Sequence, residues 1–322
     1  MKKTVINWGV IGTGIISTSF AKDCAFVPNA KLHSVISRKK ENAHSFAAQY
    51  GISHVHTDLD QMLRDPELDA VYIGTPHPHH FGAARAAMKA GKAVLCEKPL
   101  TVTAEETSKL IAIQKETGVY LMEAMWTYFL PAIQKAKEWV DSGRIGDVVA
   151  IKGDFGYPQI YDPKSRTYNP DLAGGALLDM GIYPVAFAYL FSGGRTPKRL
   201  MTSARFAPNG IDDDITTIFE YDQKMTATLG TSFRARLKNM GVIIGTKGHI
   251  EIPDFFRASQ CAYYELDDCL ETFCDHRKSI GLSFETEAMC QDLLKGRLES
   301  RVVPLKASQA FADHMEMIRK SW

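Results

Sequence analysis

Short apolar runs alternate with amphipathic segments from the N-terminus to about residue 123, and this alternation restricts the fold more than any other feature of the 322-residue chain. Strands that alternate with helical segments indicate βαβ units and a parallel sheet. A Thr103-x-x-Glu106 capping box opens one helical segment and Gly118 closes it. We therefore predict an α/β domain with parallel strands at 5–11, 31–37, 70–74, 93–97 and 120–123.

The pattern changes after residue 123. Longer strand-like runs follow one another with turn residues between them, at 148–155, 199–206, 215–221, 225–233, 241–252 and 261–266. Consecutive strands of this kind predict an open, largely antiparallel sheet. Helical patterns occupy 175–191 and 284–320. We predict two domains, 1–123 for the α/β part and 124–322 for an α+β part, which suits a chain of this length.

Composition excludes several classes of protein. The net charge is +1 and the Lys and Arg residues are scattered, which is not typical of proteins that bind nucleic acid or an anionic membrane. No stretch approaches the roughly 20 apolar residues of a membrane helix. The six cysteines form no Cys-x-x-Cys pair, so we expect free thiols and a cytoplasmic location. A small molecule is the expected partner.

A glycine pair lies where the first strand gives way to the first helix. Gly12 permits a tight turn, and Gly14 lets backbone N–H groups approach a pyrophosphate at the helix N-terminus. Ser17 occupies the third position of this fingerprint, which is usually glycine. We predict a Rossmann dinucleotide-binding domain, with Ile15 and Ile16 of the first helical turn also at the cofactor.

The end of the second strand indicates which dinucleotide binds. An NAD-binding protein usually has an acid there for the ribose hydroxyls, but this chain reads Ser37-Arg38-Lys39-Lys40. A hydroxyl and a guanidinium can bind the 2′-phosphate of NADP through charge-assisted hydrogen bonds. The residues therefore favour NADP over NAD, with solvated turn charges as the alternative.

The strand at 93–97 ends in Glu97-Lys98-Pro99. Ligands of open parallel sheets bind outside the carboxyl ends of the strands, so Lys98 is expected to project into the crevice where a nicotinamide lies. Its ammonium can bind a substrate hydroxyl or stabilise a developing alkoxide. Glu97 is expected to hold the ammonium or a cofactor hydroxyl. A surface ion pair at the end of a strand is the alternative.

Five motifs in order resemble those of one superfamily. They are Gly12-x-Gly14, "GTPHPHH" at 74–80, "AGKAVLCEKPLTV" at 90–102, "MEAMWTYFLP" at 122–131 and "GGALLDMGIYP" at 174–184. Together they resemble the glucose-fructose oxidoreductase/inositol dehydrogenase/rhizopine catabolism (Gfo/Idh/MocA) superfamily over essentially the whole chain. Within it, the chain is most similar to the dimeric dihydrodiol dehydrogenases and the NADP-dependent D-xylose dehydrogenases.

The resemblance implies hydride transfer between NADP and a cyclic polyol, either an aldose or a trans-dihydrodiol. It also implies an oligomer, a dimer or tetramer formed through the sheet of the second domain. The site residues it implies fall into three groups. Lys98, Asp179 and Tyr183 are catalytic; Trp126 and Phe155 wall the substrate pocket together with Asp179 and Tyr183; and Thr75, Pro76, His80 and Trp126 lie beside the cofactor.

Asp179 and Tyr183 are four residues apart in a predicted helix over 175–191, which places them on one face. Pro184 is expected to kink this helix. Tyr183 is the expected proton donor or acceptor, its ordinary pKa of about 10 lowered by the Lys98 ammonium. The alternative is that Tyr183 packs as a half-buried aromatic side chain and Asp179 caps the helix. Tyr128 stands where the family usually has an arginine, a departure that bears on cofactor affinity and substrate charge.

The remaining candidate motifs give weaker evidence for a function. The histidines of "HPHH" at 77–80 lack the acid or cysteine partners of a zinc site, so we predict no metal there. The acidic run 212–214 is predicted to be a solvated hairpin turn. Two other functions share many of the motifs: a dinucleotide-dependent enzyme that cleaves glycosides through a transient oxidation, and a non-catalytic regulator that senses the cofactor. The presence of Lys98 and Tyr183 argues against the regulator.

Overall fold

A computed structural model describes residues 3–322, apart from the side chain of Gln223. The chain forms two compact units. The first comprises Met1–Trp126 and Lys278–Ser308, and the second comprises Thr127–Arg277 and Gln309–Trp322. The first boundary between the units lies at 126/127, where 123/124 was predicted, and the segment Lys278–Ser308 belongs to the first unit. An amphipathic pattern indicates that one face of a helix is buried, but it does not show which sheet that face packs on.

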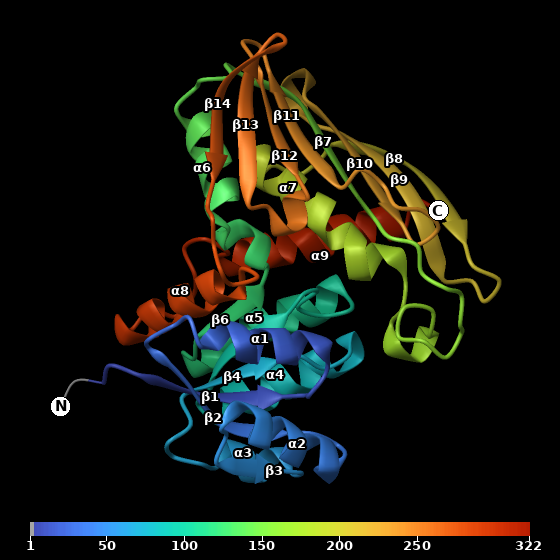
Figure 1. The fold of residues 1–322 in the computed structure, drawn as a ribbon. Coiled ribbons are helices and arrows are strands. Elements are labelled where there is room, and N and C mark those ends of the chain that lie inside the picture. The colour runs from blue at the N-terminus through green and yellow to red at the C-terminus, as the bar shows by residue number, and fades with distance from the viewer. Residues whose placement is uncertain (1–2) are drawn as a thin grey trace. The chain divides into compact units, whose positions relative to one another are not determined.

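The first unit is built on a six-stranded parallel sheet in the order β3-β2-β1-β4-β5-β6 (Figure 1). The predicted α/β fold is therefore confirmed. The strands are β1 (Ile6–Ile11), β2 (Ala30–Ile36), β3 (His54–His56), β4 (Ala70–Ile73), β5 (Ala93–Glu97) and β6 (Leu121–Ala124). The helices are α1 (Ile15–Cys24), α2 (Lys40–Tyr50), α3 (Leu59–Leu63), α4 (His80–Lys89), α5 (Ala104–Thr117) and α8 (Leu282–Leu294). The short strand β3 was not predicted from the sequence.

Both faces of this sheet are covered. On one face, residues of α3, α4 and α5 pack on strand residues such as Val71 and Val94 in one buried cluster. On the other, Phe20 of α1 stacks on Tyr72 of β4 with ring centroids 3.8 Å apart. The returning helix α8 packs against α1. The Asp23 carboxylate of α1 accepts three backbone N–H groups near the start of α8, from Ile280 (3.2 Å), Gly281 (3.0 Å) and Ser283 (3.1 Å).

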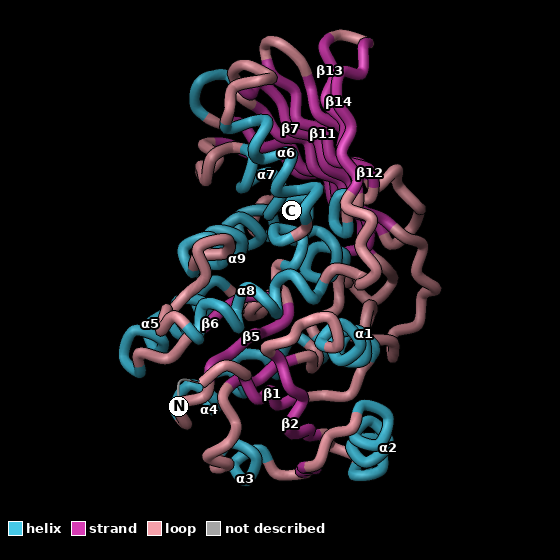
Figure 2. Tube along the Cα trace, turned by 60° about the vertical axis from the view of Figure 1, so that its left-hand side comes forward, coloured by secondary structure: helices cyan, strands magenta, loops and turns pink. Residues whose placement is uncertain are grey.

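The second unit contains an eight-stranded sheet in the order β14-β13-β12-β11-β7-β10-β9-β8, which forms one layer of strands in Figure 2. All neighbours are antiparallel except β7 and β10, which confirms a largely antiparallel sheet. The strands are β7 (Val148–Gly156), β8 (Arg199–Phe206), β9 (Asp212–Glu220), β10 (Thr226–Ser232), β11 (Met240–Gly245), β12 (His249–Pro253), β13 (Gln260–Glu265) and β14 (Asp268–Cys274). The helices are α6 (Pro131–Asp141), α7 (Ile182–Phe191) and, from Gln309 on, α9 (Leu305–Arg319).

Several strand predictions in this unit needed correction. The single strand predicted over 241–252 is a hairpin, because residues 246–248 form a turn closed by a 2.8 Å hydrogen bond from the Gly245 N–H to the Gly248 carbonyl. The strand β14 was missed. The helical pattern at 284–320 is two helices, α8 and α9.

The acidic run 212–214 begins β9 and is not a solvated turn. Each carboxylate has a partner: Asp212 accepts the Leu177 N–H (2.7 Å), Asp213 the Arg234 guanidinium (2.8 Å) and Asp214 the Ser232 hydroxyl (2.8 Å). Burial raises the pKa of Asp212 to about 6. The sequence shows three like charges, but it does not show the donors that the fold brings to them.

The predicted helix over 175–191 contains a π-helical turn, Leu177–Gly181, followed directly by α7. Pro184, in the first turn of α7, lacks a backbone N–H, and a wider turn before a proline avoids the clash of its ring with the preceding carbonyls. The whole stretch Pro170–Phe191 is long and apolar enough to cross a membrane, contrary to the expectation from sequence. However, 78% of its most apolar window is buried inside the structure, as in the core helix of a globular domain.

Candidate active site

The turn between β1 and α1 is made by backbone and depends on glycine. Gly12 has a φ of 98°, and a Cβ there would lie 3.0 Å from the Gly74 carbonyl oxygen, so a side chain would be strained. Gly14 precedes α1 without a side-chain cap, and a Cβ there would have no atom within 4 Å. The N–H groups of the first turn of α1 therefore lie at the surface of the loop, where a phosphate can reach them.

Ser17 shows why the third glycine of the fingerprint is dispensable here. The third glycine usually allows the helix to approach the strand. In this chain the close approach is made on the other side, because a Cβ on Gly74 would lie 2.3 Å from the Ser17 hydroxyl oxygen. The space that the serine side chain needs is supplied by a glycine at the end of the neighbouring strand.

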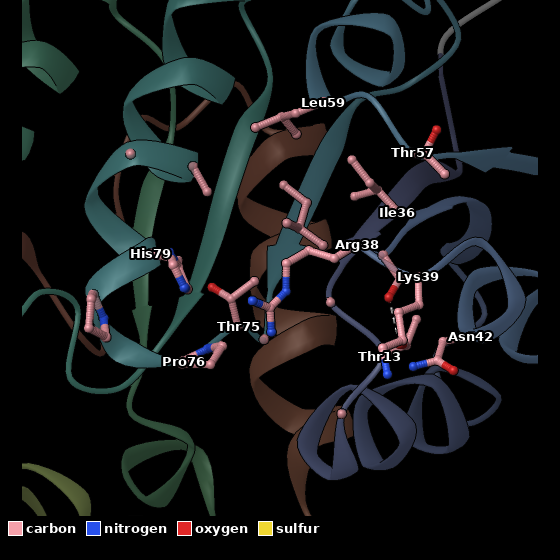
Figure 3. A pocket seen from close by; sticks show the side chains of 18 residues that line it. Thr13, Ile36, Arg38, Lys39, Asn42, Thr57, Leu59, Thr75, Pro76 and His79 are labelled. Carbon is pink, nitrogen blue, oxygen red and sulfur yellow. Dashed lines mark hydrogen bonds between the residues drawn. The ribbon is translucent and has the colours of Figure 1, made fainter. Parts of the chain in front are cut away.

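A pocket of about 990 Å³ opens beside this turn, and all of its lining residues belong to the first unit (Figure 3). It is lined by Gly12, Gly14, Ser37, Arg38, Thr75 and Pro76, all of which the sequence assigned to the cofactor. The lining also includes Thr13, Lys39, Asn42, Thr57, Leu59 and His79, which the sequence analysis did not assign. Twelve of the 18 lining residues were thus not assigned to the cofactor, because the sequence does not show which side chains near a motif face the pocket.

The end of β2 contributes the polar wall of this pocket. The Thr13 hydroxyl lies 3.2 Å from the Ser37 hydroxyl, which ties the glycine turn to the end of β2. Arg38 extends its guanidinium into the pocket (Figure 3). The residues that line the pocket include two cations, Arg38 and Lys39, and no carboxylate. This wall can therefore accept an anionic group through charge-assisted hydrogen bonds.

Six residues assigned to the cofactor do not line this pocket: Ile15, Ile16, His80, Glu97, Lys98 and Trp126. Ile15 is exposed at the start of α1. His80 is fully buried, and its two ring nitrogens lie 2.9 Å from the Pro99 carbonyl and 2.8 Å from the Thr75 carbonyl. Burial lowers the pKa of His80, so the neutral ring donates to one of the two carbonyls. His80 thus connects the segment after β4 to the segment after β5.

Lys98 follows β5 and is half-buried, at the same edge of the parallel sheet as the glycine turn. The carboxylate of Glu97 is buried and accepts the Tyr72 hydroxyl (2.6 Å) and the Lys98 backbone N–H (3.3 Å). Burial raises the pKa of Glu97, and the Tyr72 hydrogen bond and the Lys98 charge partly offset this. The Glu97 carboxylate is therefore held in place by the Tyr72 hydroxyl and the backbone of Lys98.

Glu123 is a second buried acid next to Lys98. It lies on β6, beside Cys96 of β5, and accepts the Leu100 N–H (2.8 Å). Burial raises the pKa of Glu123 to about 7, although hydrogen bonds and the Lys98 charge act in the opposite direction. Sequence analysis missed Glu123 and Tyr72. The signal for Glu123 was present, since a glutamate in an otherwise apolar strand needs a partner.

The metal prediction concerns "HPHH" at 77–80. His77 and His80 are buried with ring centroids 5.8 Å apart, and both nitrogens of His80 face carbonyl oxygens. A different group, His33, His54 and Asp65, brings three ligand-type atoms within 4.8 Å of one another. There, the His33 Nε2 atom is 2.7 Å from the Asp65 carboxylate, which is the geometry of a hydrogen-bonded histidine and aspartate pair.

The second unit places Tyr183 in an aromatic cluster. Its ring contacts that of Phe155 edge to face, with centroids 5.3 Å apart, and that of Phe256 at 5.9 Å. Phe155 and Phe256 are stacked, with centroids 4.0 Å apart. Phe155 was assigned to the substrate pocket and Phe256 was not. Trp126, the other predicted wall residue, ends the first unit.

Asp179 lies in the π-helical turn, one turn before Tyr183. Its carboxylate pairs with the Arg166 guanidinium through two hydrogen bonds, Nη1 to Oδ1 (2.9 Å) and Nη2 to Oδ2 (3.1 Å). The side chain of Asp179 is 14% exposed and that of Arg166 48%. Arg166 was not singled out in the sequence, because the loop that carries it has no regular pattern.

Comparison with known proteins identifies the family. A profile described as "Oxidoreductase family, NAD-binding Rossmann fold" matches residues 6–125, and one described as "GFO/IDH/MocA C-terminal domain" matches residues 133–251. The chain belongs to the Gfo/Idh/MocA family. It is therefore an oxidoreductase whose first unit binds a nicotinamide dinucleotide.

Members of the family resemble this chain along nearly its whole length. Human trans-1,2-dihydrobenzene-1,2-diol dehydrogenase is 31% identical over 98% of this chain and 96% of its own, and the Xenopus laevis enzyme is 32% identical over 96% of each. Among solved structures, aldose-aldose oxidoreductase from Caulobacter crescentus has a TM-score of 0.90 at 24% identity, covering 98% of this chain and 97% of that chain. A 3-ketoreductase from Actinomadura kijaniata in complex with NADP has a TM-score of 0.86 at 25% identity, covering 98% of both chains.

Tyr128, the departure from the usual family arginine, has a structural role in the second unit. It is buried, its hydroxyl donates to the Ala186 carbonyl of α7 (2.6 Å), and its ring contacts Phe311 edge to face. The tyrosine thus braces the helix that follows the π-helical turn. A phenol fits this buried position, whereas a guanidinium there would need a counter-charge.

Proposed function

We propose that this protein transfers a hydride between NADP and a cyclic polyol, either an aldose or a trans-dihydrodiol. The observation that carries the proposal is that the dinucleotide pocket and Lys98 lie at the same edge of one parallel sheet, at the carboxyl ends of adjacent strands β1, β4 and β5. Relatives that act on trans-1,2-dihydrobenzene-1,2-diol and on aldoses support the substrate class.

The chain's own share of the reaction is to bind and orient the substrate and to move one proton. When bound, the dinucleotide accepts or donates the hydride. The Lys98 ammonium donates a hydrogen bond to the reacting oxygen. The Tyr183 phenolate takes the proton of the substrate hydroxyl during oxidation, and the phenol gives a proton to the carbonyl oxygen during reduction. Asp179 accepts a hydrogen bond from a substrate hydroxyl. The stacked Phe155 and Phe256 rings give the apolar face of a sugar or diol a surface to pack on.

The substrate is tested by a panel of aldoses and trans-dihydrodiols assayed at 340 nm with NADP and with NAD. We expect reduction of NADP with at least one cyclic polyol. Release of a sugar from an added glycoside without net change in absorbance would instead indicate glycoside cleavage, and tight cofactor binding without turnover would indicate a regulator. Either result would overturn the proposal.

NADP is preferred over NAD in this proposal, because the pocket has Ser37, Arg38 and Lys39 and no carboxylate among its lining residues. Fluorescence titration with NADPH and NADH measures the preference. Arg38→Ala should weaken NADPH binding at least 10-fold and leave NADH binding nearly unchanged. Lys40→Ala is the matched control, since Lys40 is the exposed cation two positions on and does not line the pocket. Tighter binding of NADH than of NADPH by the unaltered protein would refute the preference.

We also propose a homodimer or homotetramer formed through the sheet of the second unit. Helices α6 and α7 contact one face of this sheet. A row across the other face, matched by the strand register, contains Met201, Ile218, Lys152 and Val242, and Met201 is 49% exposed. Such a mixed apolar face suits a second copy of the chain. Equilibrium sedimentation should give a multiple of the 35.8 kDa chain mass, and a monomer alone would contradict the proposal.

The six cysteines are free thiols, two of them exposed, which supports a reducing, cytoplasmic setting. The even spread of charge gives no support to a nucleic acid or membrane partner, so the proposed partner is the small polyol.

A further inference from the structure

Arg166 has a place in the site that the motifs did not reveal. It lies in the loop that connects β7 to the π-helical turn, and its guanidinium donates to both oxygens of the Asp179 carboxylate, at 2.9 and 3.1 Å. A fork of two parallel hydrogen bonds fixes the plane of a carboxylate as well as its distance. An ammonium, which is a point charge, would fix only the distance of the carboxylate and not its plane.

The backbone on both sides of this pair is held in place. The Asp179 N–H donates to the Gly175 carbonyl (3.2 Å), and the Gly175 N–H donates to the Thr167 carbonyl (2.9 Å), next to Arg166. A Cβ on Gly174 would lie 2.6 Å from the Thr167 carbonyl oxygen, so the two chain segments are in direct contact there. The loop is also tied to the rest of the unit, because the Asn209 side chain donates to the Tyr168 carbonyl (2.6 Å).

The pair differs from an ordinary surface ion pair because one partner is mostly buried. The Asp179 side chain is 14% exposed, whereas that of Arg166 is 48% exposed and reaches inward to it. A carboxylate has about four lone-pair directions, and the fork takes up two of them. Asp179 lies one helical turn before Tyr183, so the orientation of its carboxylate bears on where a polyol binds in the proposed function.

We propose that Arg166 is a positioning residue: it holds the Asp179 carboxylate in one orientation, so that Asp179 presents a fixed acceptor to a substrate hydroxyl. Arg166 acts through Asp179. The inference rests on the proposed function, since it takes Asp179 to contact the polyol. It adds a residue of the β7 loop to the parts that determine where the substrate lies.

The test compares Arg166→Ala, Arg166→Lys and the control Lys164→Ala in steady-state kinetics with the polyol found in the panel. Lys164 is an exposed cation in the same loop, two residues before Arg166. Arg166→Ala should lower kcat/KM for the polyol at least 10-fold. The KM for NADP and the melting temperature should stay near their original values. Arg166→Lys should recover only part of the loss, because an ammonium cannot make the fork. Lys164→Ala should have no effect.

Two further measurements separate positioning from a structural role. Added guanidinium ion at millimolar concentration should restore part of the turnover of Arg166→Ala and none of that of Asp179→Asn. In a double-mutant cycle, Arg166→Ala should cost little once Asp179 is Asn. Additive losses, or a loss of Arg166→Ala activity that follows a lower melting temperature, would overturn the positioning role. Full activity of Arg166→Ala would overturn it while leaving the proposed function intact. An unaltered protein inactive on every polyol would overturn both.

Discussion

The two units differ in which chemical groups form their candidate sites. In the first, one side of the dinucleotide pocket is a backbone turn, made by Gly12, Gly14 and the start of α1. In the second, the groups next to Tyr183 are side chains, the Phe155 and Phe256 rings and the paired Arg166 and Asp179. Backbone donors are present whatever the sequence, whereas side chains can change one at a time. Substitutions are therefore expected to change the second group of residues more readily than the first.

The comparison is tested most strongly by separating chemistry from cofactor binding. Tyr183→Phe and Lys98→Met should each lower kcat by 10²-fold or more, because each removes a proton-transfer or hydrogen-bonding group. NADPH binding, measured by fluorescence titration, should survive in both. Tyr161→Phe, a change to an exposed tyrosine of the second unit, serves as the control. Near-native turnover of either variant would remove that residue from the chemistry.

Two alanine substitutions test the role of the glycine turn in the cofactor pocket. Gly12→Ala forces a side chain at φ 98° against the Gly74 carbonyl and should destabilise the fold by up to about 3 kcal/mol. Gly14→Ala places its methyl group in open space, so the melting temperature should stay unchanged while dinucleotide affinity falls. Thermal melting with and without NADPH measures both effects. Equal loss of stability in the two variants would break the distinction.

The units should also differ in their response to pH. Burial lowers the pKa of His314, in α9 of the second unit, to about 4, against about 6.5 in an unfolded chain. Protonation of the His314 ring favours the unfolded state. His314 therefore does not reduce the free energy of unfolding above pH 6.5, and this free energy decreases as the pH falls towards 4. The loss is about 2 kcal/mol near pH 5. His314→Phe should make the acid limb of a pH series of urea unfolding curves shallower.

Glu123 in the first unit should act in the opposite direction. Its folded pKa of about 7 lies above the unfolded value of about 4.3, so its contribution to stability is present at low pH and is lost as the pH rises between these values. Compared with the original chain, Glu123→Gln should therefore raise the free energy of unfolding more at pH 8 than at pH 5. A pH series that is identical for the original chain and both variants would show that neither group titrates in this range.

The smallest expected effect concerns Tyr128. Tyr128→Phe removes the hydrogen bond to the Ala186 carbonyl and should cost about 1 kcal/mol of unfolding free energy. NADPH affinity should not change, because Tyr128 is a buried residue of the second unit that does not line the dinucleotide pocket. A weaker NADPH affinity would show that this position still serves the cofactor, as the family arginine is expected to.

The sequence predicted most where local rules decide the structure. The parallel strands, the glycine turn and the capping box of α5 depend on residues close together in the chain, and Thr103 does accept the Glu106 N–H (3.2 Å). The π-helical turn, the partners of the acidic run 212–214 and the pairing of Arg166 with Asp179 depend on which segments meet. The periodicity of the sequence does not show which distant segments come into contact. The roles of Lys98, Asp179 and Tyr183 remain predictions that the variants above test.

The return of α8 to the first unit has a consequence for how the protein is made. Until residues 278–308 have left the ribosome, α1 has no helix packed on its outer side, and the Asp23 carboxylate lacks the three N–H groups that it accepts in the finished fold. The dinucleotide-binding unit is consequently completed only after residues 127–277 of the other unit have been synthesised, although its pocket is lined by residues between Ile11 and Ala83. A nascent chain would carry the whole nucleotide pocket on a half-covered sheet, open to chaperones and proteases.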